Sequence, residues 1–192
     1  VDKARARYAA DAEMEGKYSN STTLMGDVPP LNEDEQEALN ALDVRRDPGK
    51  VTQLELKVEG LTSTSFLRVY PHITSLVLNV NRLRSLDGLQ HLQSLEHLEA
   101  KDNALVDISA FANTTGLRFV SLDDNQVADL SALSLHQGLQ RLTVNNNSLK
   151  TLHSLVGCNF PKLQRLEVYQ NSLVNVPEGA LRGLTRLTYL DL

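Results

Sequence analysis

The sequence predicts an α/β solenoid, in which stacked units each add one short strand to a parallel sheet and return through a turn or short helix. Three observations predict this fold. An apolar pattern recurs every 22 or 24 residues from residue 51 to residue 192. Apolar and polar residues alternate over three positions in each unit, which is the period of a half-buried strand. An Asn then follows at a fixed distance in five successive units.

The repeats align on one leading apolar position. These positions are Val51, Ile73, Leu95, Leu117, Leu139, Leu163 and Leu187. Two further apolar residues follow three and five positions later, such as Leu54 and Leu56 in the first repeat. The Asn positions are Asn81, Asn103, Asn125, Asn147 and Asn171. The first repeat has Glu59 in that place. By this alignment, residues 51–192 contain six full repeats and a truncated seventh.

This pattern, LxxLxLxxNxL, resembles that of the leucine-rich repeat family over about residues 51–192. The resemblance implies a horseshoe-shaped solenoid with a parallel sheet on its concave side and 3₁₀ or very short helical turns on its convex side. Repeats two to five are similar to the 22-residue class of phosphatase-regulating and internalin proteins. Their return segments carry a second apolar pair: Leu86 and Leu89, Ile108 and Phe111, Leu130 and Leu133, Leu152 and Leu155. Repeat six, with Pro177 and Gly183, is similar to the 24-residue class, for which we expect a fuller convex turn.

The physics of stacking agrees with this pattern. A single three-residue strand cannot bury its apolar face, so neighbouring units must supply a continuous leucine core. The Asn is expected to turn inward where each strand ends. Its amide carries both donors and an acceptor, which can bridge backbone groups of adjacent repeats.

The first 50 residues do not follow the repeat. Residues 1–30 are expected to form an N-terminal helix and a linker, which contains Pro29 and Pro30. Residues 31–50 are expected to form a helical N-terminal cap. Asn32 and Glu35 resemble a capping box, and Leu39 and Leu42 lie on the apolar side of the helix that follows. Such a helix would cover the open end of the leucine core.

Composition and charge exclude several functional classes. The 192 residues carry a net charge of −5, which argues against nucleic acid as the main partner. No apolar run reaches about 18 residues, so no insertion into a membrane is expected. The single cysteine, Cys158, cannot form the cysteine-rich caps that secreted relatives usually carry. We therefore expect an intracellular, cytoplasmic protein, and the 22-residue class also allows a cytoskeletal or ciliary location.

The sequence contains no signal for catalysis. It has no P-loop, nucleophile elbow or GxGxxG motif. Cys158 has no activating neighbour and is expected to pack in or near the core. An acidic and histidine-containing group on the strands is interpreted as a solvated polar face rather than a metal site. It comprises His97, Glu99, Asp102, Asp123 and Asp124. We expect no enzymatic activity and no cofactor or metal.

The outward-facing positions of the strands are the candidate binding surface. One column carries aromatic and Arg side chains, which are enriched at binding hot spots. The candidate partner-binding residues are Phe119, Arg141, Arg165, Tyr169 and Tyr189, with His97, Glu99 and Asp123 alongside them. The alternative is an ordinary solvated sheet with scattered aromatic residues.

These observations predict a non-enzymatic protein-interaction module, an intracellular scaffold or adaptor that binds a partner protein on the concave sheet. The alternative is the recognition arm of a larger enzyme or receptor whose active domain lies outside this sequence. An extracellular binding protein is the third and weakest hypothesis. Repeat seven stops at Leu192 without its Asn or return segment, so we expect the natural protein to continue. We also expect the chain to self-associate through that end.

Overall fold

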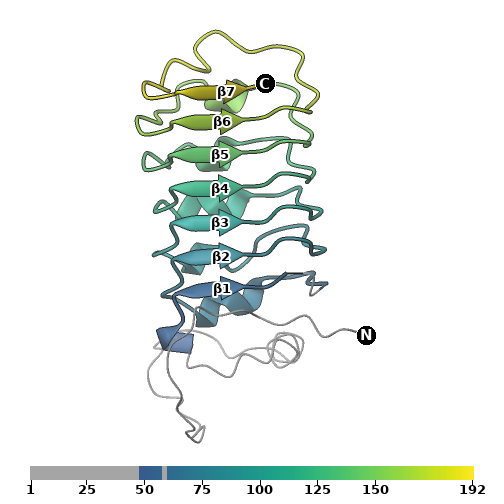
Figure 1. The fold of residues 1–192 in the computed structure, drawn as a ribbon, viewed down its shortest axis with the longest axis vertical. Coiled ribbons are helices and arrows are strands. Elements are labelled where there is room, and N and C mark those ends of the chain that lie inside the picture. The colour runs from purple at the N-terminus through teal and green to yellow at the C-terminus, as the bar shows by residue number, and fades with distance from the viewer. Residues whose placement is uncertain (1–47, 58–59) are drawn as a thin grey trace, which may run out of the picture.

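Seven short strands lie side by side in one parallel sheet, in the order of the chain, within the residues that the structure describes (Figure 1). The structure is a computed structural model, and it describes residues 48–57 and 60–192. The strands are β1 (Gln53–Glu55), β2 (Ser75–Val77), β3 (His97–Glu99), β4 (Phe119–Ser121), β5 (Arg141–Thr143), β6 (Arg165–Glu167) and β7 (Tyr189–Asp191). The expected N-terminal helix, linker and most of the cap, together with Glu59, lie outside the described residues.

The strand register confirms the alignment of the repeats. Each strand pairs with the next so that equivalent positions stand opposite one another, as Leu76 does with Leu98 and Leu98 with Val120. The same register holds between β5 and β6, although their repeat is 24 residues long rather than 22. The two extra residues therefore lie in the return segment, and equivalent strand positions stay aligned across the whole sheet.

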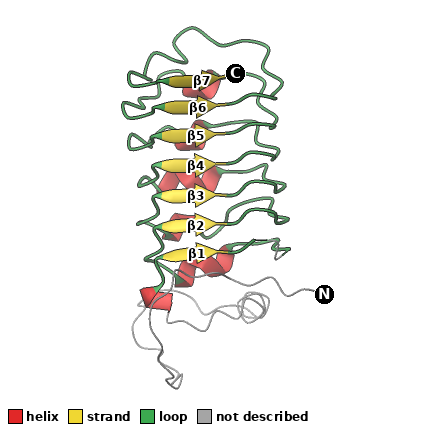
Figure 2. Cartoon of the chain, viewed as in Figure 1, coloured by secondary structure: helices red, strands yellow, loops and turns green. Residues whose placement is uncertain are grey.

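Short 3₁₀ helices form the return side of most repeats, as the sequence predicts, and they lie behind the sheet (Figure 2). They are η2 (Ser65–Val69), η3 (Leu89–His91), η4 (Ser109–Asn113), η5 (Ser131–Leu133) and η6 (His153–Leu155), whereas η1 (Pro48–Lys50) precedes the first strand. Asp107 and Asp129 start η4 and η5, because each carboxylate accepts a hydrogen bond from the backbone N–H two residues later, at 2.8 and 3.1 Å.

Repeat six has the longer convex turn expected of the 24-residue class, but this turn is not helical. Its return segment contains hydrogen-bonded turns at about residues 178–183 and no 3₁₀ helix. Ala180 N–H donates to the carbonyl of Pro177, and Arg182 N–H donates to that of Gly179. Gly179 has a φ of +87°, which interrupts a right-handed helical turn at this point. The extra residues therefore lengthen the loop without adding a helix.

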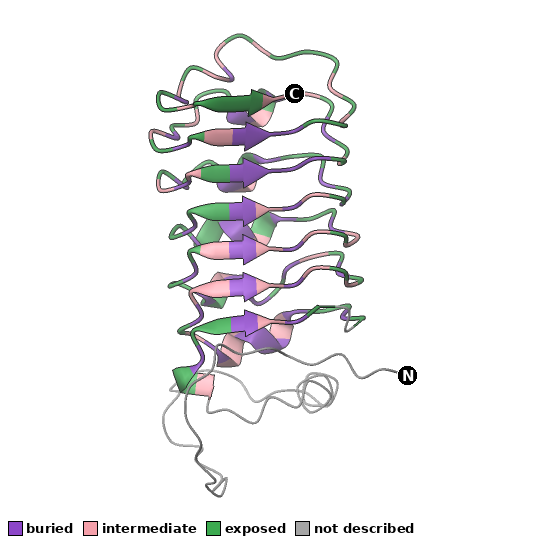
Figure 3. Ribbon diagram, in the orientation of Figure 1, coloured by how far each residue is buried: buried purple, intermediate pink, exposed green. Residues whose placement is uncertain are grey.

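The core lies between the sheet and the 3₁₀ helices and consists mostly of leucines. Figure 3 shows buried residues in every strand from β1 to β6. The middle residue of every strand from β1 to β6 is buried, whereas Leu190 of β7 is 40% exposed. All eight residues of the second apolar pairs are buried as predicted, because they close the core from the return side. Burying each leucine contributes roughly 1.5–3 kcal/mol.

The five Asn residues form the predicted inward-facing ladder. Asn125 is the central member: its Oδ1 accepts from Leu105 N–H at 2.9 Å, and its Nδ2 donates to the carbonyls of Ala100 and Leu122 at 2.9 and 3.0 Å. The other four residues bond the preceding repeat in the same manner. Each amide therefore satisfies polar backbone groups that the core would otherwise leave without partners.

A left-handed residue precedes each Asn of the ladder. The five residues are Val80, Asp102, Asp124, Asn146 and Gln170, with φ between 52° and 61°. This conformation turns the backbone out of the strand direction directly before the Asn side chain enters the core. Asp and Asn tolerate it better than other residues, whereas a β-branched residue such as Val80 is strained there.

Candidate partner-binding face

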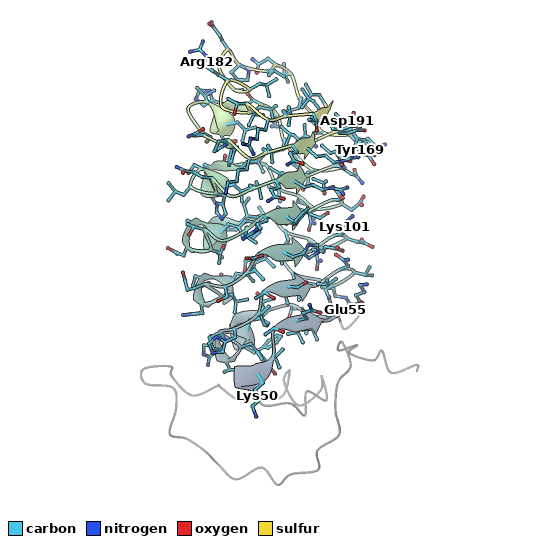
Figure 4. All side chains as sticks on the ribbon, turned by 60° about the vertical axis from the view of Figure 1, so that its left-hand side comes forward. Lys50, Glu55, Lys101, Tyr169, Arg182 and Asp191 are labelled. Atoms are coloured by element: carbon cyan, nitrogen blue, oxygen red, sulfur yellow. The ribbon has the colours of Figure 1, made fainter. Side chains whose placement is uncertain are left out.

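The first and third residues of each strand point away from the core and line the open face of the sheet. Figure 4 shows this face along the side on which Glu55, Lys101, Tyr169 and Asp191 project, with Arg182 on the opposite side. The register places His97, Phe119, Arg141, Arg165 and Tyr189 in one row across β3 to β7. The structure thus brings the predicted residues onto one surface.

Three aromatic side chains are exposed on this face. Phe119 is 40% exposed, Tyr189 42% and Tyr169 39%. An aromatic ring contributes more to the free energy of folding or binding when it is covered, because each ring then buries a large apolar area. Their exposure here leaves apolar area that a partner can cover.

The His97 end of the row surrounds a shallow hollow of about 130 Å³. His97 Nε2 lies 3.1 Å from Glu99 Oε1, and the His97 ring is tilted against Phe119 with 5.9 Å between ring centroids. The other side chains on the rim include Lys101, Arg141 and Thr143. Burial alone would raise the pKa of Glu99, but hydrogen bonds to Asn79 and His97 outweigh this effect and the pKa is lowered. Glu99 is therefore ionised at neutral pH, and the hollow is polar.

Asp123 stabilises the sheet as well as contributing charge to its face. Its Oδ1 accepts from Asn145 N–H at 2.9 Å, and its Oδ2 accepts from the hydroxyls of Ser121 and Thr143, both at 3.1 Å. Lys101 Nζ lies 3.3 Å from the same Oδ2. With this many protein partners, both oxygens of Asp123 are already engaged within the sheet, which leaves this predicted binding residue less free to contact another molecule.

The Arg residues converge on a carboxylate that the sequence analysis did not select. Glu167 Oε1 accepts from Arg165 Nε and from Arg141 Nη2, the latter at 3.4 Å. The hydrogen bond from Arg165 is the main cause of the lowered pKa of Glu167. The Arg165 guanidinium also stacks over the ring of Tyr189, 3.8 Å from its centroid. Position could have revealed Glu167, since residues two apart on a strand share a face.

The remaining sequence-derived candidates show no catalytic arrangement. Cys158 Sγ donates to the Ser154 carbonyl, and burial raises the pKa of its thiol, so this group is not an activated nucleophile. Across residues 48–57 and 60–192, no three His, Cys, Asp or Glu side chains gather in a way that could hold a metal ion. No helix in the described part of the chain has the length and apolar character needed to cross a membrane.

Comparison with known proteins agrees with this architecture. Residues 137–192 match the family model described as Leucine rich repeat. An internalin from Listeria monocytogenes superposes with a TM-score of 0.62 and 25% sequence identity over 71% of this chain, which spans only 39% of that internalin. Internalin C2 of the same organism has the same fold, with a TM-score of 0.51 and 19% identity over 74% of this chain and 80% of its own. None of the curated proteins matches the sequence.

Proposed function

Because this chain belongs to the leucine-rich repeat family, we propose that it is a non-enzymatic protein-interaction module that binds a partner protein on the open face of its sheet. Solenoids of this kind expose one extended surface, which they commonly use for recognition. The observation that carries the proposal is the row from Phe119 to Tyr189, in which exposed aromatic rings border two adjacent Arg side chains.

The finer parts of the proposal concern cellular role. We propose a cytoplasmic scaffold or adaptor, because the repeats resemble the 22-residue class and the single Cys158 provides no disulfide-braced cap. The second candidate is the recognition arm of a larger protein. This candidate is favoured by the internalin match, in which a segment like this one makes up 39% of a longer chain.

Self-association through β7 is a separate part of the proposal. Within these 192 residues Tyr189, Leu190 and Leu192 are all at least 40% exposed, and exposed strand residues can pair with a strand of another chain. Sedimentation velocity over a range of protein concentrations tests this part. A sedimentation coefficient that does not rise with concentration would exclude it.

Affinity purification from cells of the source organism tests the binding face. The test variant combines Phe119→Ala and Tyr169→Ala on the sheet. The matched control combines Leu135→Ala and Val174→Ala, which remove exposed apolar groups from the return segments, where these residues are 63% and 86% exposed. We expect specific proteins to co-purify with the wild type and the control but not with the test variant. Recovery of the same proteins with all three would show that the partner binds elsewhere.

A further inference from the structure

Two guanidinium groups share one carboxylate on the part of the open face formed by β5 and β6. Arg141 and Arg165 stand opposite each other on β5 and β6, and both bond Glu167 Oε1. Only 9% of Glu167 is exposed, whereas the side chains of Arg141 and Arg165 are 49% and 38% exposed. The negative charge therefore lies beneath the two positive charges, and solvent meets the guanidinium groups first.

This arrangement leaves positive charge uncompensated at the surface. Two Arg side chains contact a single ionised carboxylate, so one positive charge remains among the three groups. Asp191, the register partner of Glu167, acts on Arg165 from a greater distance and forms no ion pair with it in the described part of the chain. Asp123, the next carboxylate along the face, is already bonded to Lys101 and the neighbouring strand.

Most hydrogen-bond donors of the two guanidinium groups have no protein acceptor in the described residues. A guanidinium carries five N–H donors. Arg165 uses its Nε–H and Arg141 uses one Nη2–H, both for Glu167. The remaining N–H groups are available for the paired hydrogen bonds that Arg forms with carboxylates.

Aromatic rings border the two Arg residues on both sides. Phe119 is the register partner of Arg141, and Tyr189 is that of Arg165 and lies under its guanidinium group. Stacking on Tyr189 restrains Arg165, so less conformational entropy is lost when it binds an anion. The exposed rings provide apolar area on either side of the charge.

From this geometry we infer that Arg141 and Arg165 bind a carboxylate side chain of the partner protein, flanked by apolar residues that cover Phe119 and Tyr189. This inference rests on the proposed function and names the chemistry of the partner at the same face. A singly charged carboxylate matches the one remaining positive charge. A phosphate dianion would exceed it and would be repelled more strongly by Glu167, which lies beneath the two Arg residues.

Three short peptides test the inference: acetyl-Leu-Asp-Phe-amide, its Asn counterpart and its phosphoserine counterpart. Each is titrated into ¹⁵N-labelled protein while NMR follows the Arg Nε–H and backbone amide signals. We expect the Asp peptide to shift the Arg141 and Arg165 signals and to bind at least tenfold more tightly than the Asn peptide. Its affinity should also fall as salt is added.

Three variants separate this site from general attraction of an anion. The double variant Arg141→Gln with Arg165→Gln should lower the affinity for the Asp peptide at least fivefold. The control, Arg118→Gln with Arg182→Gln, removes the same charge from exposed positions outside the row and should change the affinity less than twofold. Glu167→Gln keeps an acceptor for the Arg residues but removes the negative charge. It should therefore raise the affinity for the phosphoserine peptide more than the affinity for the Asp peptide.

Equal binding of the Asp and Asn peptides would overturn the inference, as would an equal loss in the control variant. Tighter binding of the phosphoserine peptide to the wild type would also overturn it, in favour of a phosphorylated partner. None of these results affects the proposed function, because its test depends on Phe119 and Tyr169 and on the natural partner. Conversely, the Asp peptide could bind at Arg141 and Arg165 while Phe119→Ala with Tyr169→Ala still recovers every natural partner. That pair of results would support the inference and contradict only the proposed binding face for the natural partner.

Discussion

Asn125 Nδ2 lies 2.9 Å from the carbonyl oxygen of Ala100, a residue 25 positions earlier in the chain. The same amide accepts a hydrogen bond from Leu105 and donates to its own repeat, so one side chain ties two repeats together inside the core. The same hydrogen bonds to the preceding repeat recur at each Asn of the ladder. Neighbouring repeats are therefore held together by buried hydrogen bonds as well as by apolar packing.

We expect Asn125→Ala to lower the free energy of unfolding by roughly 1–3 kcal/mol, because the Leu105 N–H would be left buried without its acceptor and the Ala100 carbonyl would keep only the longer, 3.3 Å hydrogen bond from Asn103. Urea denaturation followed by circular dichroism measures the change. Asn113→Ala, at an exposed position in η4, is the matched control and should have little effect. A midpoint unchanged in Asn125→Ala would contradict a stabilising role for the ladder.

Val80→Asn should stabilise the protein by about 1 kcal/mol. Val80 has a φ of 61°, which is unfavourable for a β-branched residue, and the four other left-handed positions that precede a ladder Asn carry Asp, Asn or Gln. Val106→Asn is the control, because Val106 is also exposed but is not left-handed. Thermal unfolding of both variants measures the difference. If both have the same midpoint, strain at Val80 contributes nothing measurable.

Gly88→Ala should be more destabilising than Gly157→Ala. Both glycines have positive φ, at 104° and 78°, but an added Cβ at Gly88 would lie 2.4 Å from the Thr64 carbonyl oxygen, whereas Gly157 faces open space. The steric overlap should add roughly 1–3 kcal/mol to the cost of the left-handed conformation. Equal denaturation midpoints would show that η2 and η3 move apart without cost.

Stability should fall when the pH drops below about 6.5, in part because of His136. This side chain is fully buried, and its two ring nitrogens lie 3.1 and 3.0 Å from the carbonyls of Leu133 and Thr114. Burial lowers the pKa of His136, so the unfolded chain takes up a proton at a higher pH than the folded protein does. The loss therefore begins near the unfolded pKa and is complete below the folded one.

Chemical denaturation at pH 7.5 and pH 5 measures this dependence. The difference in free energy of unfolding between the two pH values should be smaller in His136→Gln than in the wild type. His153→Gln, at an exposed position, should keep the dependence of the wild type. A His136→Gln variant with the same pH dependence would exclude this residue as a source of it.

The sequence was sufficient to predict the columns of the sheet and the Asn ladder. The aligned motif predicts which residues stand side by side even where the spacing changes from 22 to 24 residues, as it does between Arg141 and Arg165. The left-handed position before each Asn was not predicted, because Val80 and Gln170 obscure the preference that Asp and Asn show there.

The role of Glu167 could not be predicted because it depends on side-chain direction. Glu167 was not among the candidate residues, whereas Asp123 was placed both in an acidic group and among the candidates. Which carboxylate meets Arg141, and which meets the hydroxyls of Ser121 and Thr143, is decided by the rotamers that packing allows. The cap expected at residues 31–50 stays a prediction for nearly all of its length.

Because the register does not shift, equivalent residues on neighbouring strands are spaced evenly across the open face. Neighbouring strands of a sheet are about 4.8 Å apart, so Phe119 on β4 and Tyr189 on β7 are separated by roughly 14 Å along the row, with Arg141 and Arg165 at the two intermediate steps. Inserting or deleting one whole repeat between β4 and β7 would move the two rings by one such step and leave the local geometry of every other repeat unchanged. A partner that covers both rings must therefore present its apolar groups at this distance, and repeat number, rather than side-chain identity alone, determines which partners can do so.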